Sequence, residues 1–329
     1  MNKKKYHIEK LLEKELITSE QNLKISNYFS LGIFSVRNEL LFLMYLSVLL
    51  FTSGIGILIY DNIDTIGHSI LLLILLALIV ISYYFSYKKY PGYSKDDVDF
   101  ENPIYNYLVL LATILSCSFM GYLQFQYQIF GNQFQIAILI SAAIALISAY
   151  YFNNKSALSI GITALATSIG ITLTPQTLID NDIYWNEELL YYGIILSVLL
   201  LLWSFYSEKI ALKKHFDLVL LTFTLHLACI CCIAGLINDF WMIFGLLLAA
   251  STYYFYTKSF KIPSISIFVF TLLYAFIGFN IFVVRLFDTI DFLDFFATLF
   301  FFLPIYFVVS IVLFINAIKK FNKITHDSI

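Results

Sequence analysis

Long apolar stretches, each close to the length of a membrane-spanning helix, alternate with short polar connections over most of the chain. A helix of about 20 apolar residues crosses a hydrocarbon core ~30 Å thick. The stretches lack the strict apolar–polar alternation of a barrel strand, so we expect helices. Ten stretches qualify: residues 40–60, 66–87, 104–127, 134–152, 156–174, 188–206, 216–236, 239–257, 263–284 and 295–317. The pattern predicts an all-α integral membrane protein.

The first 39 residues are polar and charged and precede the first apolar stretch. Ile8, Leu11, Leu12 and Leu16 fall on one face of a predicted helix. The sequence from Thr18 to Gln21 has the pattern of a capping box that would begin a second helix. Two helices of this size cannot bury a core alone. We therefore expect residues 1–39 to pack on each other, on the membrane surface or on a cytosolic or membrane protein.

Basic residues fall almost entirely on one side of this topology. If the N-terminus, the even-numbered connections and the C-terminus share a side, that side holds 19 of the 20 Lys and Arg residues. The other side holds only Arg285. Because cytoplasmic loops carry the excess of Lys and Arg, we expect both termini in the cytoplasm.

The order of the spans predicts five helical hairpins, each with its turn on the outer side. Residues 1–39 would form a cytosolic helical segment, 40–87 the first transmembrane hairpin and 88–103 an acidic cytosolic linker. Residues 104–317 would supply eight further transmembrane helices, and 318–329 a cytosolic tail. Aromatic residues followed by Lys recur at the cytosolic ends, and glycine recurs toward the outer ends. A structural repeat explains this recurrence, and so does an aromatic belt with positive-inside anchoring.

Composition agrees with a surface that faces lipid. The chain of 329 residues is 60% hydrophobic and 13% charged, with a mean hydropathy of +0.83, whereas soluble domains carry roughly 25% charged residues. The formal net charge of -2 gives no reason to expect a nucleic-acid partner. All four cysteines lie inside apolar stretches, so we expect no disulfide framework. The partner that composition predicts is the lipid bilayer.

The N-terminal third resembles a known family. The residues that carry the resemblance are the segment Leu16–Gln21, a first span rich in Leu and Gly (Tyr45 to Tyr60), and the outer turn from Asp61 to Gly67. They are similar to a bacterial family of predicted multi-pass membrane proteins of unknown function with a short cytosolic N-terminal helical segment. Ile63 stands where that family usually has Trp. The resemblance covers residues 8–90 and implies a location in the bacterial cytoplasmic membrane, but no site residues.

Few ionisable residues lie inside the spans, and each is a candidate for function. His226 lies in the middle of the seventh span, followed at three-residue steps by Cys229 and Cys232. Imidazole and thiolate are ligands of soft metal ions. Packing explains the same residues more simply, because Cys behaves as a small apolar residue and a neutral His hydrogen-bonds a neighbouring helix. We therefore predict neither a metal nor a cofactor.

A second group of polar residues lies where the ninth span ends and the tenth begins. Asn280 and Arg285 are followed at three-residue spacing by Asp288, Asp291 and Asp294. These side chains would suit the mouth of a cation path. The alternative is that the acids favour the positive end of the next helix dipole while Arg285 reaches the interface. With His226, they are the candidate polar path through the bundle.

The chain lacks the sequence patterns of the common enzyme classes, such as a P-loop, GxSxG or HExxH. We therefore expect a non-enzymatic membrane scaffold or accessory protein, with residues 1–39 as its docking element. The alternative is a transporter or channel for a small neutral or apolar solute. That alternative predicts a continuous polar-lined path through the seventh, ninth and tenth spans.

Overall fold

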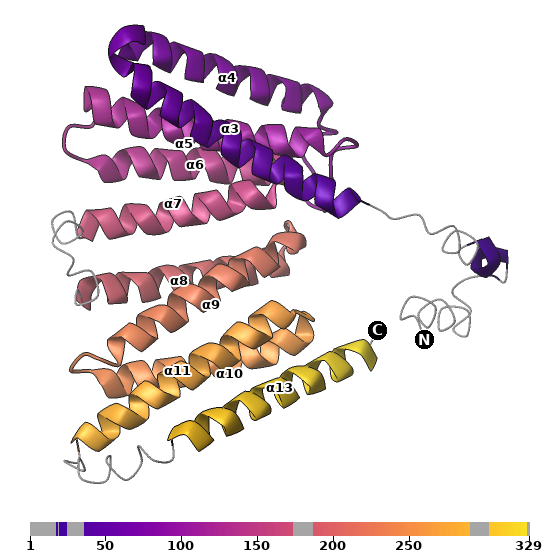
Figure 1. Ribbon diagram of the computed structural model, residues 1–329, viewed down its shortest axis with the longest axis vertical. Helices are drawn as coiled ribbons and strands as arrows, with labels where there is room; N and C mark the ends of the chain where they lie inside the picture. The colour runs from indigo at the N-terminus through magenta and orange to yellow at the C-terminus, as the bar shows by residue number, and fades with distance from the viewer. Residues whose placement is uncertain (1–17, 19, 25–35, 174–186, 290–302, 328–329) are drawn as a thin grey trace. The chain divides into compact units, whose positions relative to one another are not determined.

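Ten long helices occur in the computed structural model, which describes residues 18, 20–24, 36–173, 187–289 and 303–327. They follow the ten predicted spans in order, and the described residues contain no strand. The prediction of an all-α fold is confirmed (Figure 1). The helices are α3 (Arg37–Ile66), α4 (His68–Lys89), α5 (Ile104–Tyr127), α6 (Phe134–Phe152), α7 (Lys155–Leu173), α8 (Glu187–Lys209), α9 (Asp217–Gly235), α10 (Trp241–Lys261), α11 (Ile265–Thr289) and α13 (Leu303–Asp327), with a short 3₁₀ turn, η2 (Lys214–Phe216).

Eight of these helical stretches are long and apolar enough to cross a membrane, counted over the described residues. The two helices outside this set are α7 and α10. The described side chains of α7 end at residue 170, and the second half of α10 is rich in Tyr and contains Lys258 and Lys261. The chain is thus an all-α protein with several candidate membrane spans.

The chain divides into two compact units, residues 1–53 and 54–329. In the first unit, residues 20–24 are helical. The backbone N–H of Thr18 donates to Oε1 of Gln21 over 2.9 Å, and the N–H of Gln21 donates to Oγ1 of Thr18 over 3.3 Å. This reciprocal pair is a capping box, as the sequence predicts. The predicted apolar face on residues 8–16 lies outside the described residues.

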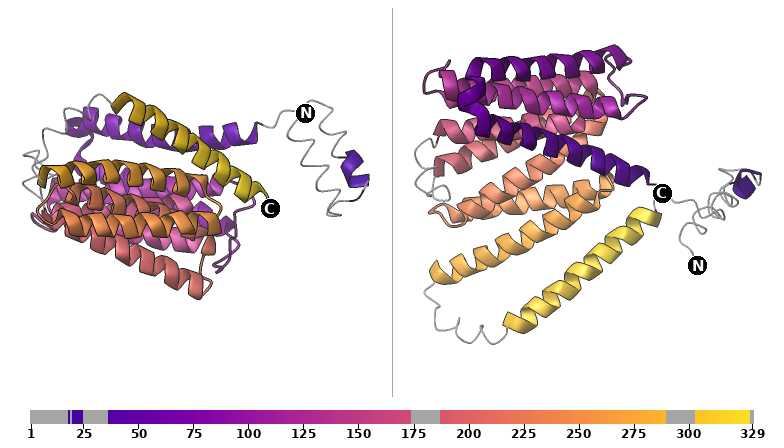
Figure 2. Two further views of the ribbon diagram at one scale, coloured as in Figure 1. Left: turned by 90° about the horizontal axis from the view of Figure 1, so that it is seen from below. Right: turned by 45° about the horizontal axis from the view of Figure 1, so that its top comes forward.

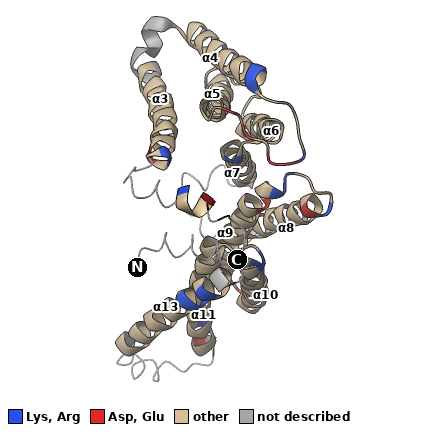
Figure 3. Ribbon diagram, turned by 90° about the vertical axis from the view of Figure 1, so that its right-hand side faces the viewer, with Lys and Arg blue, Asp and Glu red and all other residues tan. Residues whose placement is uncertain are grey.

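The second unit is built from helices that lie side by side with alternating direction (Figures 1 and 2). The most extensively packed neighbours are α4 with α5, α6 with α7, α8 with α9, and α10 with α11. Each of these pairs is joined at the end where α4, α6, α8 and α10 finish, which we call the lysine-rich end. Figure 3 looks onto this end and shows the basic residues gathered there, on α4, α7, α8 and α10 among others. Helix α13 packs on α11, where Phe321 stacks on Phe268 with ring centroids 4.3 Å apart.

The turn between α3 and α4 is shorter than the sequence predicts. Residues 61–65 were expected to form a connecting turn, but the helix continues through Ile66. The helix therefore extends six residues beyond the predicted end of the first span at residue 60. The chain reverses at Gly67, whose φ of 79° lies in a region that favours glycine. The N-cap residue of α4 is Gly67, which has no side chain, so no side-chain hydrogen bond caps this helix.

At the other end of the chain, α13 continues to Asp327, beyond the predicted limit of the last span at residue 317.

Close helix packing depends on glycine at some positions and not at others. A Cβ added at Gly235, the last residue of α9, would overlap the buried ring of Phe244 on α10. A Cβ added at Gly121 on α5 would meet nothing within 4 Å. Small residues allow helices to approach closely in lipid, where apolar burial adds little to their association. The glycines that recur toward the outer ends therefore do not share one packing role.

We predict opposite effects for two matched substitutions. Gly235→Ala should lower the free energy of unfolding by about 1–3 kcal/mol, because the new methyl group overpacks the site against Phe244. Gly121→Ala should leave stability unchanged or raise it by up to about 1 kcal/mol, because Ala is the better helix former. Thermal unfolding of the purified protein in detergent measures both. Equal effects of the two substitutions would contradict the packing role of Gly235.

Candidate functional site

A partly buried polar cluster joins three distant segments at the lysine-rich end. We call it the linker cluster: Asp97, Asn153, Lys213 and His215. Nδ2 of Asn153 donates to Oδ1 of Asp97 over 2.8 Å, and Oδ1 of Asn153 accepts from Nζ of Lys213 over 3.0 Å. The backbone N–H of Lys213 donates to the carbonyl of Lys95 over 2.8 Å. The acidic linker, residues 88–103, is thereby tied to the α6–α7 turn and to the α8–α9 turn.

The backbone at two cluster residues explains their positions. Asn153 and Lys213 have φ values of 60° and 50°, in the left-handed region. Asn153 is the C-cap of α6, and Asn tolerates this conformation because its short side chain makes local hydrogen bonds. The next residue, Asn154, accepts from the N–H of Ala157 at the start of α7 over 2.9 Å. Its Nδ2 donates to the carbonyl of Asn106 on α5 over 2.9 Å. The tight α6–α7 turn therefore also holds the start of α5.

Lys213 carries the buried positive charge of the cluster. The residue has no exposed surface, and its Nζ lies 5.2 Å from the centroid of the Tyr93 ring. Burial lowers the pKa of this ammonium, while the negative charge of Asp97 opposes that shift. His215 is also close, with Nε2 3.6 Å from Oδ1 of Asp97. A buried charge is tolerated when it is paired and hydrogen-bonded, and Lys213 has an amide oxygen, a carboxylate and an aromatic face around it.

Aromatic packing supports the same end of the bundle. Tyr90 and Phe100 of the linker bury their rings against Phe152 at the end of α6, with centroids 5.5 and 6.3 Å from it. Burial and the charges of nearby acids raise the pKa of the Tyr90 hydroxyl. Phe152 is only 6% exposed, so this member of the aromatic pattern packs inside the protein. The linker thus adds its own small core to the lysine-rich end.

His226 is used to contact a neighbouring helix. Its Nδ1 lies 2.7 Å from the hydroxyl of Tyr274 on α11, and its ring packs edge-on against Phe270 at 4.7 Å. Cys229 and Cys232 are buried in the core between α9 and α10. In the part of the chain that the structure describes, no three His, Cys, Asp or Glu side chains come together in a way that could hold a metal ion.

Asn280 joins α11 to α13. Its Nδ2 donates to the carbonyl of Phe276 within its own helix over 2.6 Å. Its Oδ1 accepts from the hydroxyl of Tyr306 on α13 over 2.9 Å. The ring of Tyr306 stacks on Phe276 with centroids 5.9 Å apart. Pro304 lies in the first turn of α13, where proline is tolerated because the N–H it lacks has no helical partner there.

Arg285 binds the end of α9. Its Nε donates to the carbonyl of Leu236 over 3.2 Å, and its Nη2 donates to the carbonyl of Ile237. Its Nη1 lies 3.7 Å from Oδ2 of Asp288. The last carbonyls of a helix lack intrahelical partners, so the guanidinium satisfies groups that would otherwise need water. Asp291 and Asp294 lie outside the described residues. His226, Asn280 and Arg285 thus hold three different contacts rather than meeting at one site.

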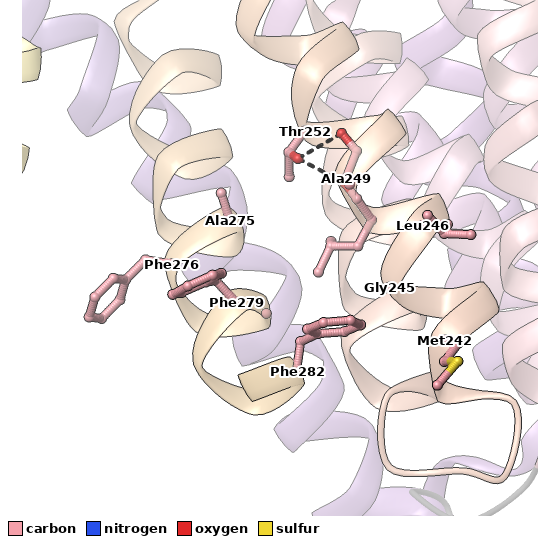
Figure 4. A pocket seen from close by; sticks show the side chains of 11 residues that line it. Met242, Gly245, Leu246, Ala249, Thr252, Ala275, Phe276, Phe279 and Phe282 are labelled. Carbon is pink, nitrogen blue, oxygen red and sulfur yellow. Dashed lines mark hydrogen bonds between the residues drawn. The ribbon is translucent and has the colours of Figure 1, made fainter. Parts of the chain in front are cut away.

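An apolar crevice of about 770 Å³ lies between α10 and α11 (Figure 4). Among the described residues that line it, Thr252 has the one polar side chain, and its hydroxyl donates to the carbonyls of Leu248 and Ala249 in its own helix at 2.8 and 3.1 Å. The hydropathy pattern predicts the two helices but not the crevice, because it does not fix which helix faces meet. The lining residues are Met242, Gly245, Leu246, Leu248, Ala249, Thr252, Ala275, Phe276, Gly278, Phe279 and Phe282.

The long apolar helices and their interhelical hydrogen bonds define a multi-pass α-helical membrane protein. Residues 9–158 match the model of a family described as predicted membrane protein (DUF2157). The resemblance to a multi-pass membrane family of unknown function is thereby confirmed, over a longer part of the chain than residues 8–90. No curated protein and no solved structure matches the chain.

The sequence alone does not predict the linker cluster. The energetic coupling between Asn153 and Lys213 within it is testable. Asn153→Gly keeps the left-handed backbone and removes the amide between Lys213 and Asp97. Lys213→Met removes the buried ammonium group that donates to the oxygen of this amide. We predict that the two changes are not additive: the double variant should be more stable than the sum of the single variants implies, by about 1–2 kcal/mol. Chemical or thermal unfolding of all four proteins in detergent gives the coupling free energy. Additive effects would show that the two side chains do not depend on each other.

Proposed function

We propose that the protein is a non-enzymatic membrane scaffold or accessory protein, and that residues 1–39 dock another protein. The observation that supports this proposal is the use of its intramembrane polar groups. His226, Asn280 and Arg285 each hydrogen-bond a neighbouring helix or turn. A scaffold needs such contacts to keep its helices in fixed positions. The linker cluster serves the same purpose at the lysine-rich end of the second unit.

The docking proposal predicts a face-specific contact in cells. A photo-crosslinking amino acid at Leu12, on the expected apolar face, should give one discrete adduct with a protein partner. The same probe at Lys10, on the opposite face of the predicted helix, is the matched control and should give none. Gel analysis after irradiation of cells that express the full chain measures both. Equal labelling at the two positions, or no adduct at Leu12, would contradict docking by this face.

We also propose that the protein lies in the bacterial cytoplasmic membrane with its lysine-rich end inside, as the excess of Lys and Arg favours. Asp239 and Glu101 are exposed acids in connections at opposite ends of the second unit. In a variant without native cysteines, Asp239→Cys should react with a membrane-impermeant maleimide in intact cells. Glu101→Cys should react only after permeabilisation. The reverse result would place the lysine-rich end outside.

A second candidate function is passage of an apolar solute, and the α10–α11 crevice is the observation that favours it. The crevice would receive an apolar molecule without a polar path through the bundle. This candidate does not rest on the polar-lined path that the sequence predicts. The described residues of that path, His226, Asn280 and Arg285, each contact a different helix or turn. Transport predicts that an apolar dye enters liposomes with the protein faster than protein-free liposomes of the same lipid, whereas a scaffold role predicts equal rates.

A further inference from the structure

The α10–α11 crevice has the size and lining of a site for an apolar ligand. Its volume of about 770 Å³ falls within the range of roughly 300–1,000 Å³ that small-molecule sites occupy. The hydroxyl of Thr252 already donates to carbonyls of its own helix, so this lining side chain does not need a hydrogen bond from an occupant. An occupant must therefore be apolar where it enters the crevice.

The crevice opens to the surroundings of the bundle. Leu246 and Phe279, on the two helices that form it, are 73% and 61% exposed. Figure 4 shows the lining side chains of α10 and α11 on the two sides of the open space. Because both helices are apolar along these residues, the molecule nearest to the opening in a bilayer is a lipid acyl chain.

Polar groups lie at the end of the crevice away from the lysine-rich end. Trp241 packs its ring 5.1 Å from Phe282, a lining residue one helical turn before Arg285. Arg285 binds the carbonyls of the turn that leads into Trp241, and 32% of its side chain is exposed. In the same turn, Nδ2 of Asn238 is buried and has no hydrogen-bond acceptor among the described residues. The partly exposed guanidinium of Arg285 would face an acceptor group at the end of an inserted chain, whereas Nδ2 of Asn238 has no surface that a lipid could reach.

The charges at this end are mixed in sign. Asp288 lies 3.7 Å from Arg285 and is 62% exposed, and the exposed Asp239 belongs to the turn between α9 and α10. Among the described residues at this end, one cation with two carboxylates disfavours a ligand that carries only negative charge. It complements a headgroup that carries both a phosphate and an ammonium group.

We propose that the α10–α11 crevice binds one acyl chain of a zwitterionic aminophospholipid. In this arrangement the lipid phosphate accepts from Arg285, and the ammonium group lies near Asp288 and Asp239. Arg285 thus donates hydrogen bonds both to the carbonyls at the end of α9 and to the lipid phosphate. The inference goes beyond the scaffold proposal and does not depend on residues 1–39, so the two can fail separately.

The test uses the full chain in lipid nanodiscs with a phosphatidylethanolamine that carries a photoreactive diazirine on one acyl chain. Irradiation should label peptides from α10 and α11. Ala249→Leu places side-chain volume in the crevice and should reduce this labelling about tenfold. Ala250→Leu makes the same change at the next, exposed residue, which does not line the crevice, and should leave labelling unchanged. Equal labelling of these two variants, or no labelling of α10 and α11, would overturn the proposal.

The headgroup is tested with a phosphatidylglycerol that carries the same diazirine chain. It should label the crevice about tenfold less than the aminophospholipid, as the loss of one charge-assisted contact predicts. Arg285→Gln should lower labelling by the aminophospholipid. Because that change also removes contacts to α9, Asp288→Asn is the second variant, and it should reduce the preference between the two lipids without altering thermal stability. Equal labelling by both lipids in the unmodified protein would overturn the headgroup assignment.

Discussion

The helices of this protein must associate in an environment where apolar burial contributes little. A leucine gains almost nothing by exchanging lipid for another helix, so association depends on close packing and on hydrogen bonds between helices. The second unit uses both. Gly235 makes room for the Phe244 ring, and the pairs His226–Tyr274 and Asn280–Tyr306 connect α9 to α11 and α11 to α13. The few polar side chains in the spans that bond across helices, such as His226 and Asn280, therefore help to decide which helices are neighbours.

Helix positions were predictable because they depend on the local sum of hydropathy. The first helix is longer than its predicted span, and the reason is physical: the bilayer sets a minimum length for a spanning helix and not a maximum. A helix continues past the membrane as long as its backbone bonds are made, and here it continues to Ile66 and ends at Gly67. Glycine at position 67 is visible in the sequence, but the polar residues before it also favour a turn, so the sequence alone does not place the helix end there.

The linker cluster was not predictable in the same way. Asp97, Asn153 and Lys213 are far apart in the chain, and no periodicity connects them. Lys213 was counted among the lysines that anchor the cytosolic side, yet it is fully buried. The one local signal is the pair Asn153–Asn154 directly after an aromatic run, since Asn tolerates the left-handed conformation that a tight turn requires. Arg285 was singled out because of its charge, but its carbonyl partners in the α9–α10 turn are set by tertiary structure.

The crevice follows from the way in which small residues are distributed over α10 and α11. A Cβ at Gly245 would lie 2.7 Å from the Phe282 ring, so that glycine is matched by a large side chain on the facing helix. Gly278 is matched in the same way by Leu248. Ala249 and Ala275 also line the facing surfaces, yet the space beside them is left open. Two helices held close at matched glycines and left unfilled at alanines enclose a volume that their own side chains do not occupy. In a bilayer such a volume does not stay empty, because dispersion contacts favour filling it and lipid chains are the most abundant apolar groups at its opening.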